Sequence, residues 1–328
     1  MRPSQPDIVA SASSSGTACE ASVSRGPTVA RLRRAYGPRV HPLSRDLPSL
    51  RSQVLALMTY LATGAGLAWG CAHLIRQSPQ VGWWLYPATV FLISTRFRAV
   101  GNMLHEACHG ILVRGGKGRN ARFGRILAVL DFTQFESYSR EHFTHHRHLG
   151  DPHRDLDFAP RRRFGFGEPT PRFAWVHYLR PLTLFHVPTF LRPVLWSRRD
   201  PLGVRLARLG YAAALLCLAA WAGWVPFALF YLVPYLTGYQ VIRYWSDAVD
   251  HAGIFGSPDE FERSRNHLLP TWLLNRIAFP RNDEYHLTHH LFPAVPVRHQ
   301  PRLHRLLMDD AAYRARGHRL LSIHRERR

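Results

Sequence analysis

The chain has 328 residues, enough for one large domain or two ordinary ones, and its 43 Lys and Arg against 22 Asp and Glu give a formal net charge of +21. Such a balance is typical of nucleic-acid-binding proteins or of membrane proteins with arginine-rich cytoplasmic loops. The four cysteines form no C-x-x-C pair, which excludes a zinc ribbon and a redox dithiol.

The N-terminal segment has no regular spacing of apolar residues. Residues 1–47 are rich in Ser, Pro, Ala and Arg. Such a composition cannot bury enough apolar surface to order the chain. We therefore expect a disordered tail here.

Two long uncharged segments come next. Residues 54–75 carry no formal charge over 22 residues, long enough for a helix that crosses the hydrocarbon core of a bilayer. Residues 77–95 are also uncharged, and Trp83, Trp84 and Tyr86 near their start are typical of a membrane interface. The short link between the two segments predicts a helical hairpin whose second helix continues past the bilayer.

A second hairpin is predicted further along the chain. Residues 209–242 carry no charge over 34 residues, which is too long for a single span, and residues 223–226, Gly-Trp-Val-Pro, are the natural turn. The sequence thus predicts an all-α polytopic membrane protein with four transmembrane helices in two hairpins. Nearly all the arginines fall on one side of these spans, and the positive-inside rule places that side, with both termini, in the cytoplasm. Because this distribution explains most of the net charge, no nucleic-acid partner is expected.

Histidines recur in three short motifs on the predicted cytoplasmic side. HEACH spaces two histidines four residues apart, whereas EHFTHH and YHLTHH each place three at i, i+3 and i+4, on one face of a helix. With one more histidine just after the last span, the candidate metal ligands are His105, His109, His142, His145, His146, His251, His286, His289 and His290. Nine neutral imidazoles are too many for one tetrahedral zinc and suit two first-row metals.

Carboxylates stand beside these histidines and are expected to orient the imidazole rings. They are Glu106, Glu141, Asp151, Asp247, Asp250, Asp283 and Glu284. No catalytic residue beyond the metal ligands is predicted. Isolated histidines elsewhere, such as His177, His186, His267 and His318, are expected to be surface or capping residues.

HEACH also fits H-E-x-x-H, the helical zinc motif of metalloproteases in which Glu106 would act as a base. An intramembrane protease buries this motif in a span, whereas here Arg96 and Arg98 come just before it. The other histidine motifs would also have no role. The protease is therefore a distant alternative.

With these motifs in place, the chain resembles the membrane fatty acid desaturase family. The segments LHEACHG, REHFTHHRHLGDPHRDLDF, DHAGIFG and NDEYHLTHHLFPAVP recur in the family's order relative to two apolar hairpins. The resemblance predicts a desaturase-like domain over residues 48–306 and leaves residues 307–328 as a basic C-terminal tail.

The resemblance implies a helical membrane fold with a cytosolic helical cap and a non-haem di-iron centre. The three motifs match the family's histidine boxes, and His251 matches an additional ligand. Asp247 matches a position that reaches a metal through water. His148 is expected just outside the ligand set, with Glu106 and Asp283 as further supporting candidates.

The implied activity is oxidative. Two iron ions and dioxygen as co-substrate would remove hydrogen from an unactivated C–H bond of an acyl chain or related aliphatic substrate, giving an alkene. A hydroxylase or ketolase of the same superfamily, acting on a lipid, carotenoid or small metabolite, stays an alternative because both reactions begin with the same hydrogen abstraction.

The chain lacks both a cysteine set for an iron–sulfur cluster and the His-Pro-Gly-Gly signature of a fused haem domain. A separate ferredoxin or small cytochrome, reduced by an NAD(P)H-dependent reductase, is therefore expected to deliver electrons. The expected location is the bacterial inner membrane, with the active site on the cytoplasmic side.

Overall fold

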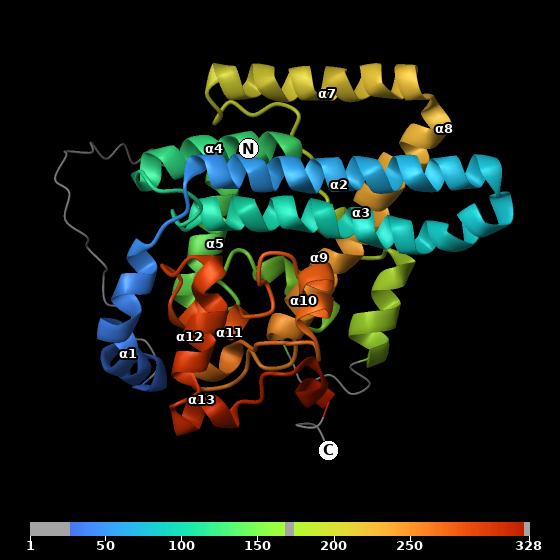
Figure 1. Cartoon of the computed structure of the whole chain (residues 1–328). Coiled ribbons are helices and arrows are strands. Elements are labelled where there is room, and N and C mark those ends of the chain that lie inside the picture. Colours follow the sequence, from blue (N-terminus) through green and yellow to red (C-terminus); the bar gives the residue numbers. More distant parts are fainter. Residues whose placement is uncertain (1–26, 168–173, 325–328) are drawn as a thin grey trace, which may run out of the picture.

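Long helices lie above a cap of shorter ones (Figure 1). The computed structural model describes residues 27–167 and 174–324, and the regular elements within these ranges are helices apart from one isolated bridge between Leu268 and Arg319. This confirms the all-α prediction. The α-helices are α1 (Pro27–Arg45), α2 (Leu50–Gln77), α3 (Pro79–Cys108), α4 (Gly116–Leu130), α5 (Phe135–His148), α6 (Val187–Phe190), α7 (Leu202–Ala222), α8 (Trp224–Phe227), α9 (Tyr239–His251), α10 (Trp272–Ala278), α11 (His286–Leu291), α12 (Gln300–Leu307) and α13 (Ala311–Ala315).

Short 3-10 or π segments connect several of these helices. They are η1 (Ala159–Phe164), η2 (Ala174–Leu179), η3 (Arg180–Thr183), η4 (Ala228–Leu232), η5 (Pro234–Gly238), η6 (Glu260–Arg263), η7 (Val297–His299) and η8 (Leu320–His324).

Helices α2 and α3 form the first predicted hairpin. The side chain of Ser49 caps α2 by accepting a hydrogen bond from the backbone N–H of Ser52 at 3.1 Å. Pro79 opens α3, and a Cβ atom at Gly82 would lie 2.5 Å from the backbone nitrogen of Ile75. Only glycine therefore permits so close a turn, after which helices of 28 and 30 residues run side by side (Figure 1).

The chain turns between α7 and α8 at Gly223, as the second predicted hairpin requires, and its φ of 93° suits glycine. From Trp224 to His251 the helix is continuous for 28 residues but contains the π segments η4 and η5. Pro234 has no backbone N–H, so regular α-helical bonding is interrupted there. Figure 1 shows α7 crossing the top of the molecule while this second helix descends away from it towards the cap.

Three helices are long and apolar enough to cross a membrane, within the residues that the structure describes: Leu50–Gln77, Leu202–Ala222 and Trp224–His251. The fourth predicted span, in α3, does not reach this standard, because its apolar residues alternate with Trp, Tyr and Pro and are followed by Arg96 and Arg98. A fourth span and the cytosolic position of the cap stay predictions.

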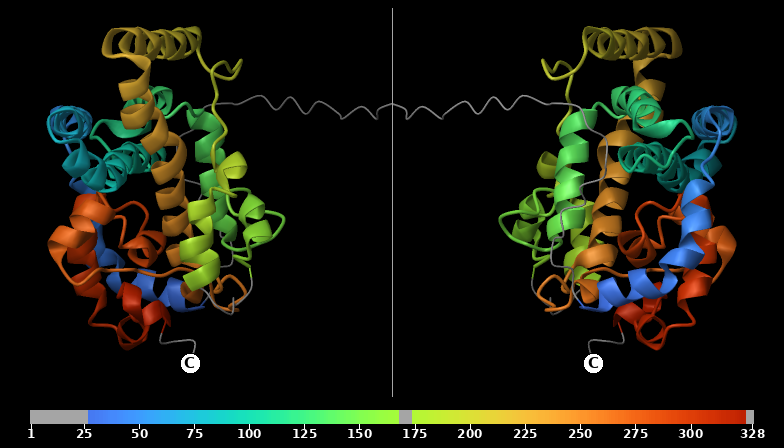
Figure 2. Two further views of the ribbon diagram at one scale, coloured as in Figure 1. Left: turned by 90° about the vertical axis from the view of Figure 1, so that its right-hand side faces the viewer. Right: turned by 90° about the vertical axis from the view of Figure 1, so that its left-hand side faces the viewer.

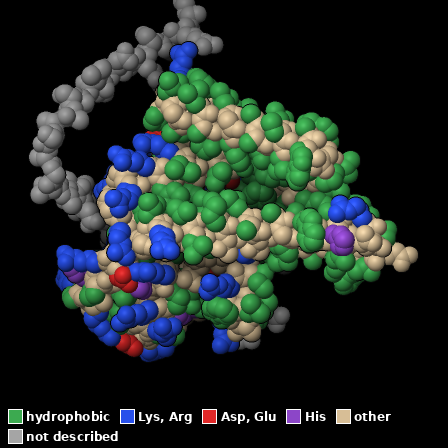
Figure 3. All heavy atoms as spheres, turned by 45° about the horizontal axis from the view of Figure 1, so that its top comes forward, with side chains coloured by type: hydrophobic (Ala, Val, Ile, Leu, Met, Phe, Trp, Pro, Cys, Tyr) green, Lys and Arg blue, Asp and Glu red, His purple; other side chains and the backbone are tan. Residues whose placement is uncertain are grey.

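The long helices expose large apolar side chains. Trp221 in α7 is 85% exposed and Trp84 in α3 is 80% exposed, which water would disfavour but lipid would not. Figure 3 shows hydrophobic side chains gathered over the long helices, whereas Lys and Arg side chains gather mainly beyond them. The distribution fits a membrane protein.

The prediction of a disordered N-terminal tail is wrong for residues 27–45, which form α1, while residues 1–26 lie outside the described part. Apolar residues at spacings of three and four follow one face of this helix and are buried: Val29, Leu32, Tyr36, Val40 and Leu43. The many arginines and prolines of the segment concealed this amphipathic period.

The predicted C-terminal tail is also wrong for residues 307–324; residues 325–328 are outside the described part. Tyr313 is fully buried and packs with α1 and α11 in one hydrophobic cluster. Leu268 donates its N–H to the carbonyl of His318 at 2.8 Å and accepts one from Leu320 at 3.0 Å. Both views in Figure 2 show the two ends of the described chain on the same side of the cap.

Four histidines expected at the surface or at helix caps are buried instead: His177, His186, His267 and His318. His186 contacts the carbonyl of Gln240 at 3.0 Å and His318 contacts that of Tyr313 at 2.9 Å. The rings of His186 and His318 thus satisfy buried backbone carbonyls, a role that the local sequence does not reveal.

Candidate metal centre

Four helices bring the predicted metal ligands together beneath the long helices. His105 lies in the last turn of α3 and His109 caps the same helix. The second motif lies in α5 and the third in α11, and His251 is the last residue of α9. Because i, i+3 and i+4 share one helical face, α5 and α11 each direct three imidazoles towards the same region.

The nine histidines form two groups, in each of which the candidate ligand atoms lie within 4.8 Å of one another. We call the first the five-histidine group; it contains His105, His109, His142, His146 and His289. The second, the four-histidine group, contains His145, His251, His286 and His290. The second and third motifs therefore each contribute to both groups.

The Nε2 atoms converge within each group. In the five-histidine group, Nε2 of His142 lies 2.9 Å from that of His109 and 3.0 Å from that of His146. In the four-histidine group, Nε2 of His286 lies 2.8 Å from that of His251 and 2.9 Å from that of His290. Two nitrogens that bind one first-row metal at about 2.1 Å and at right angles stand about 3 Å apart, so both groups have the spacing that a metal needs.

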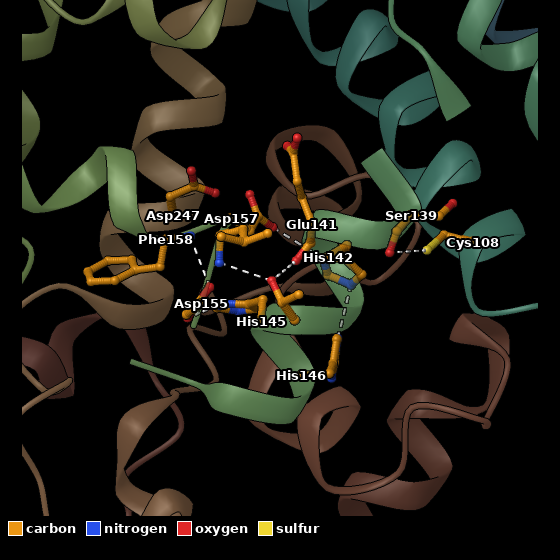
Figure 4. A network of polar contacts seen from close by, with 12 residues as sticks. Cys108, Ser139, Glu141, His142, His145, His146, Asp155, Asp157, Phe158 and Asp247 are labelled. Atoms are coloured by element: carbon orange, nitrogen blue, oxygen red, sulfur yellow. Dashed lines mark hydrogen bonds and ion pairs between the residues drawn. The ribbon is translucent and has the colours of Figure 1, made fainter. Parts of the chain in front are cut away.

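In several of these histidines, the Nδ1 atom contacts a carboxylate or a backbone carbonyl. Asp155 contacts His145 at 3.0 Å and Asp157 contacts His142 at 3.3 Å. Figure 4 shows both carboxylates beside the face of α5 that carries the second motif. An Nδ1–H bonded in this way leaves Nε2 free for a metal and fixes the ring orientation.

His251 and His286 are supported in the same manner. The carbonyl of Arg263 lies 2.9 Å from Nδ1 of His251, and Asp250 lies 3.4 Å from Nδ1 of His286. The other oxygen of Asp250 lies 3.0 Å from Nδ1 of the buried His267.

Burial and the neighbouring imidazoles lower the pKa of His146 and of His290 well below the usual range. Burial likewise lowers the pKa of His289 to about 3. For His145, burial favours the neutral ring, but the Asp155 carboxylate outweighs burial and raises the pKa. Most of these rings are thus held neutral at pH 7, the form that binds a metal.

Three predicted supporting carboxylates contact arginines rather than imidazoles. Glu106 is buried and forms an ion pair with Arg281. Asp283 accepts from Arg98 at 2.7 Å, and Asp247 pairs with Arg161. The prediction that Glu106 orients an imidazole ring is therefore not supported, because its carboxylate pairs with Arg281. The same ion pair opposes a role for Glu106 as the base of a protease. His148 lies at the end of α5 and belongs to neither group.

Sequence reasoning missed Asp155 and Asp157. It selected Asp151, which instead caps the local turn by accepting from the backbone N–H groups of His153 and Arg154 at 2.9 and 3.0 Å. The available signal was the D-L-D sequence of residues 155–157, in the loop that follows α5, since its two carboxylates contact imidazoles of that helix. Arg161 was also missed; it joins Asp157 to Asp247.

The chain is similar to known proteins over most of its length. The model of the fatty acid desaturase family matches residues 81–321, which include all nine histidines. The dihydrorhizobitoxine desaturase of Bradyrhizobium elkanii is 27% identical over 300 residues, covering 83% of this chain and 80% of that protein.

Proposed function

Because the chain belongs to the fatty acid desaturase family, we propose that this desaturase-type oxidoreductase uses two histidine-bound iron ions and dioxygen to introduce a double bond into an aliphatic substrate. The observation that carries the proposal is the convergence of nine imidazoles into two adjacent groups with metal-ligand spacing. When bound, the iron ions supply dioxygen activation and abstraction of hydrogen from an unactivated C–H bond.

Residues of the chain keep the candidate imidazole ligands neutral and correctly oriented. Burial keeps imidazoles such as His289 and His290 neutral, and Asp155 and Asp157 orient the rings of the second motif. Carboxylates also offset the positive charge that two iron ions bring into a buried site.

The overall reaction needs electrons from outside the chain. A saturated –CH2–CH2– unit loses two hydrogens, and dioxygen takes up these two hydrogens with two electrons and two protons to form two waters. We propose a ferredoxin or small cytochrome as the donor, reduced by an NAD(P)H-dependent reductase. Its acidic surface would meet the arginine-rich face of the cap in the cytoplasm, with the long helices in the inner membrane.

Desaturation is favoured over hydroxylation by the relative from Bradyrhizobium elkanii, whose name states a desaturation. The substrate named for that relative also supports a search beyond lipids. A peptidase is disfavoured because Glu106, its required base, is buried in an ion pair with Arg281.

The test combines metal analysis with product analysis. The purified protein should contain about two irons per chain, and expression in a host with a simple lipid profile should yield a product lighter by two hydrogens in mass spectra of lipids or water-soluble metabolites. His286→Ala and His145→Ala should each abolish that product and lower the iron content. Stoichiometric zinc together with peptidase activity would overturn the proposal, and a product gaining one oxygen would indicate a hydroxylase.

A further inference from the structure

An exposed aromatic ring contacts the five-histidine group from the surface of the cap. Phe143 of α5 is 46% exposed, and its ring centre lies 5.6 Å from that of His109, in an edge-to-face arrangement. By contrast, Phe255 stacks on His251 of the four-histidine group at 4.9 Å but is only 5% exposed. At Phe143, a molecule bound to the surface is therefore separated from a candidate metal ligand by a single ring.

Two positive charges lie beside this ring on α5. Arg140 and Arg147 stand three residues before and four residues after Phe143, a spacing that makes the three side chains neighbours on the helix surface. Both arginines are exposed, and in the described part of the chain neither forms an ion pair or donates a side-chain hydrogen bond. Their guanidinium groups can therefore bind carboxylates of a partner.

A third positive charge comes from the first turn of α4. Lys117 is exposed and lies beside Gly110, the residue after His109, since a Cβ atom built on Gly110 would stand 3.8 Å from its Cγ. The thiol of Cys108, at the end of α3, contacts the carbonyl of Ser139 in α5 at 4.0 Å, and Figure 4 shows the two residues side by side. Because the end of α3 adjoins α5, Lys117 adds its charge to the same surface.

Acidic residues of α5 do not cancel these charges. Glu136 pairs with Arg125 at 2.6 Å. Glu141 lies on the opposite edge of the helix from Phe143 and lines a cavity of about 530 Å³ beside the histidine groups, where three arginines act on it, Arg140 among them. Three cations against this one carboxylate still leave a net charge of +2 around Phe143.

From this arrangement we infer that Lys117, Arg140, Phe143 and Arg147, here called the α5 patch, form the docking surface for a small one-electron carrier with an acidic surface. The inference rests on the proposed function, and it names where the electron donor binds and which histidine group receives the electron. Opposite charges steer the carrier to the patch, and the ring of Phe143 leads to His109, because electron transfer slows steeply with distance.

The electrons balance in two such encounters. Each encounter oxidises one carrier by one electron and reduces one ferric ion held by the five-histidine group. Two encounters supply the two electrons that the overall reaction takes from outside the chain.

The size of the α5 patch also fits a transient partner. Electron-transfer complexes bury little surface and depend on charge for fast association, whereas permanent subunit interfaces are large and apolar. Three cations around one apolar ring on a helix edge match the first kind of contact. Anionic lipid also attracts basic residues, but it would gain nothing from a ring that contacts a metal ligand.

The first measurement is binding, which needs no turnover. The probes are two acidic carriers, a plant-type [2Fe–2S] ferredoxin and a small b-type cytochrome, titrated into the full-length, iron-loaded protein in detergent. At least one should bind with a Kd that rises with salt, because salt screens exposed charges. Arg140→Gln, Arg147→Gln and Lys117→Gln should each raise that Kd about two- to fivefold at low salt and weaken its salt dependence. Arg76→Gln removes a charge at the far end of α2 and is the matched control.

The second measurement separates docking from electron transfer. Phe143→Leu keeps an apolar side chain but removes the ring, so it should slow the stopped-flow reduction of bound iron by saturating carrier more than it changes Kd. Phe143→Tyr keeps the ring and should restore the rate. Iron content, together with reduction by photoreduced deazariboflavin, a small neutral molecule that needs no docking surface, checks that each variant folds and holds iron.

The inference is overturned if neither carrier binds, if the three charge substitutions weaken binding no more than Arg76→Gln does, or if Phe143→Leu leaves the reduction rate unchanged. It is also overturned if anionic lipid in nanodiscs blocks carrier binding to the wild type, because the α5 patch would then lie on the bilayer.

The inference and the proposed function can fail separately. A product lighter by two hydrogens, from a protein whose α5-patch variants bind and accept electrons as the wild type does, would refute the inference alone. Carrier binding and iron reduction that depend on the α5 patch, in a protein that forms no such product, would refute the proposed function alone.

Discussion

The two histidine groups differ in the contacts that their Nδ1 atoms make. In the four-histidine group, three members have such a contact, with Asp155, Asp250 and the carbonyl of Arg263. In the five-histidine group, the described residues provide a carboxylate at Nδ1 only for His142, where it comes from Asp157. The Nδ1 atom of His289 is buried without a hydrogen bond. One group thus has more candidate ligands, whereas the rings of the other are more firmly oriented. Since ring-orienting contacts raise metal affinity, we expect the two metal positions to be unequal.

The largest expected effect comes from removing a ligand. His286→Ala should lower product formation more than ~100-fold, because a two-metal site cannot work with one position disrupted, and iron should fall from about two to about one per chain. His148→Ala is the matched control, since His148 lies on α5 but in neither group. Iron analysis and product yield check both variants, and equal losses in the two would refute the grouping.

Substituting the carboxylates that contact the imidazoles tests the difference between the two groups. Asp155→Asn should weaken metal binding about 10–100-fold at the four-histidine group, and Asp157→Asn should do so at the five-histidine group. Because Asp155 supports the group whose other rings are also fixed, the two variants should produce different spectra of the bound metal. Identical spectra and affinities would mean that the two positions act as one.

Removing the metal should have a smaller effect, but it measures directly how the metal affinities of the two groups differ. A chelator should extract metal from the wild type in two phases, first from the five-histidine group, and the apparent Tm should fall with each phase because bound metal stabilises the folded chain. Asp155→Asn should bring the two phases closer together. A single phase in the wild type would contradict the predicted difference between the groups.

The smallest effect concerns a contact that should affect both groups alike. Arg33 of α1 donates to the carbonyls of Leu291 and His290 at 2.6 and 3.0 Å, at the end of α11. Arg33→Ala should lower the free energy of unfolding by about 1–3 kcal/mol and weaken both metal positions equally, because α11 contributes to both.

The matched control for this variant is Arg31→Ala. Arg31 pairs with Asp310 at the surface, so its loss should cost about 0–1 kcal/mol. Thermal melts with metal analysis distinguish the two variants. A loss confined to one group in Arg33→Ala would show that α1 acts on that group alone.

The local patterns of the chain predicted much of this molecule. Spacing of i, i+3 and i+4 placed His142, His145 and His146 on one helical face, since helix geometry depends only on the sequence interval. Uncharged runs likewise predicted the long helices α2 and α7. These features follow from periodicity and composition, which a sequence displays directly.

Local sequence patterns gave a wrong prediction where charged residues and prolines obscured the helical spacing of apolar residues. Residues 27–45 were predicted to be disordered, yet Leu32 is fully buried against Leu303 and other residues of the cap in one hydrophobic cluster. The apolar face of α1 becomes stable only when the C-terminal helices cover it, and that cover lies more than 240 residues away in the sequence.

By itself, the sequence determined which histidines share a helix face, that the fold is all-α, and that three of the four predicted spans are apolar enough to cross a membrane. Only the tertiary structure decided that His145 leaves the group of His142 and His146, and that Glu106 pairs with Arg281 instead of supporting a ring. The reason is physical: a side chain's direction from its own helix is set by local geometry, whereas its partner is set by which other helices approach that face.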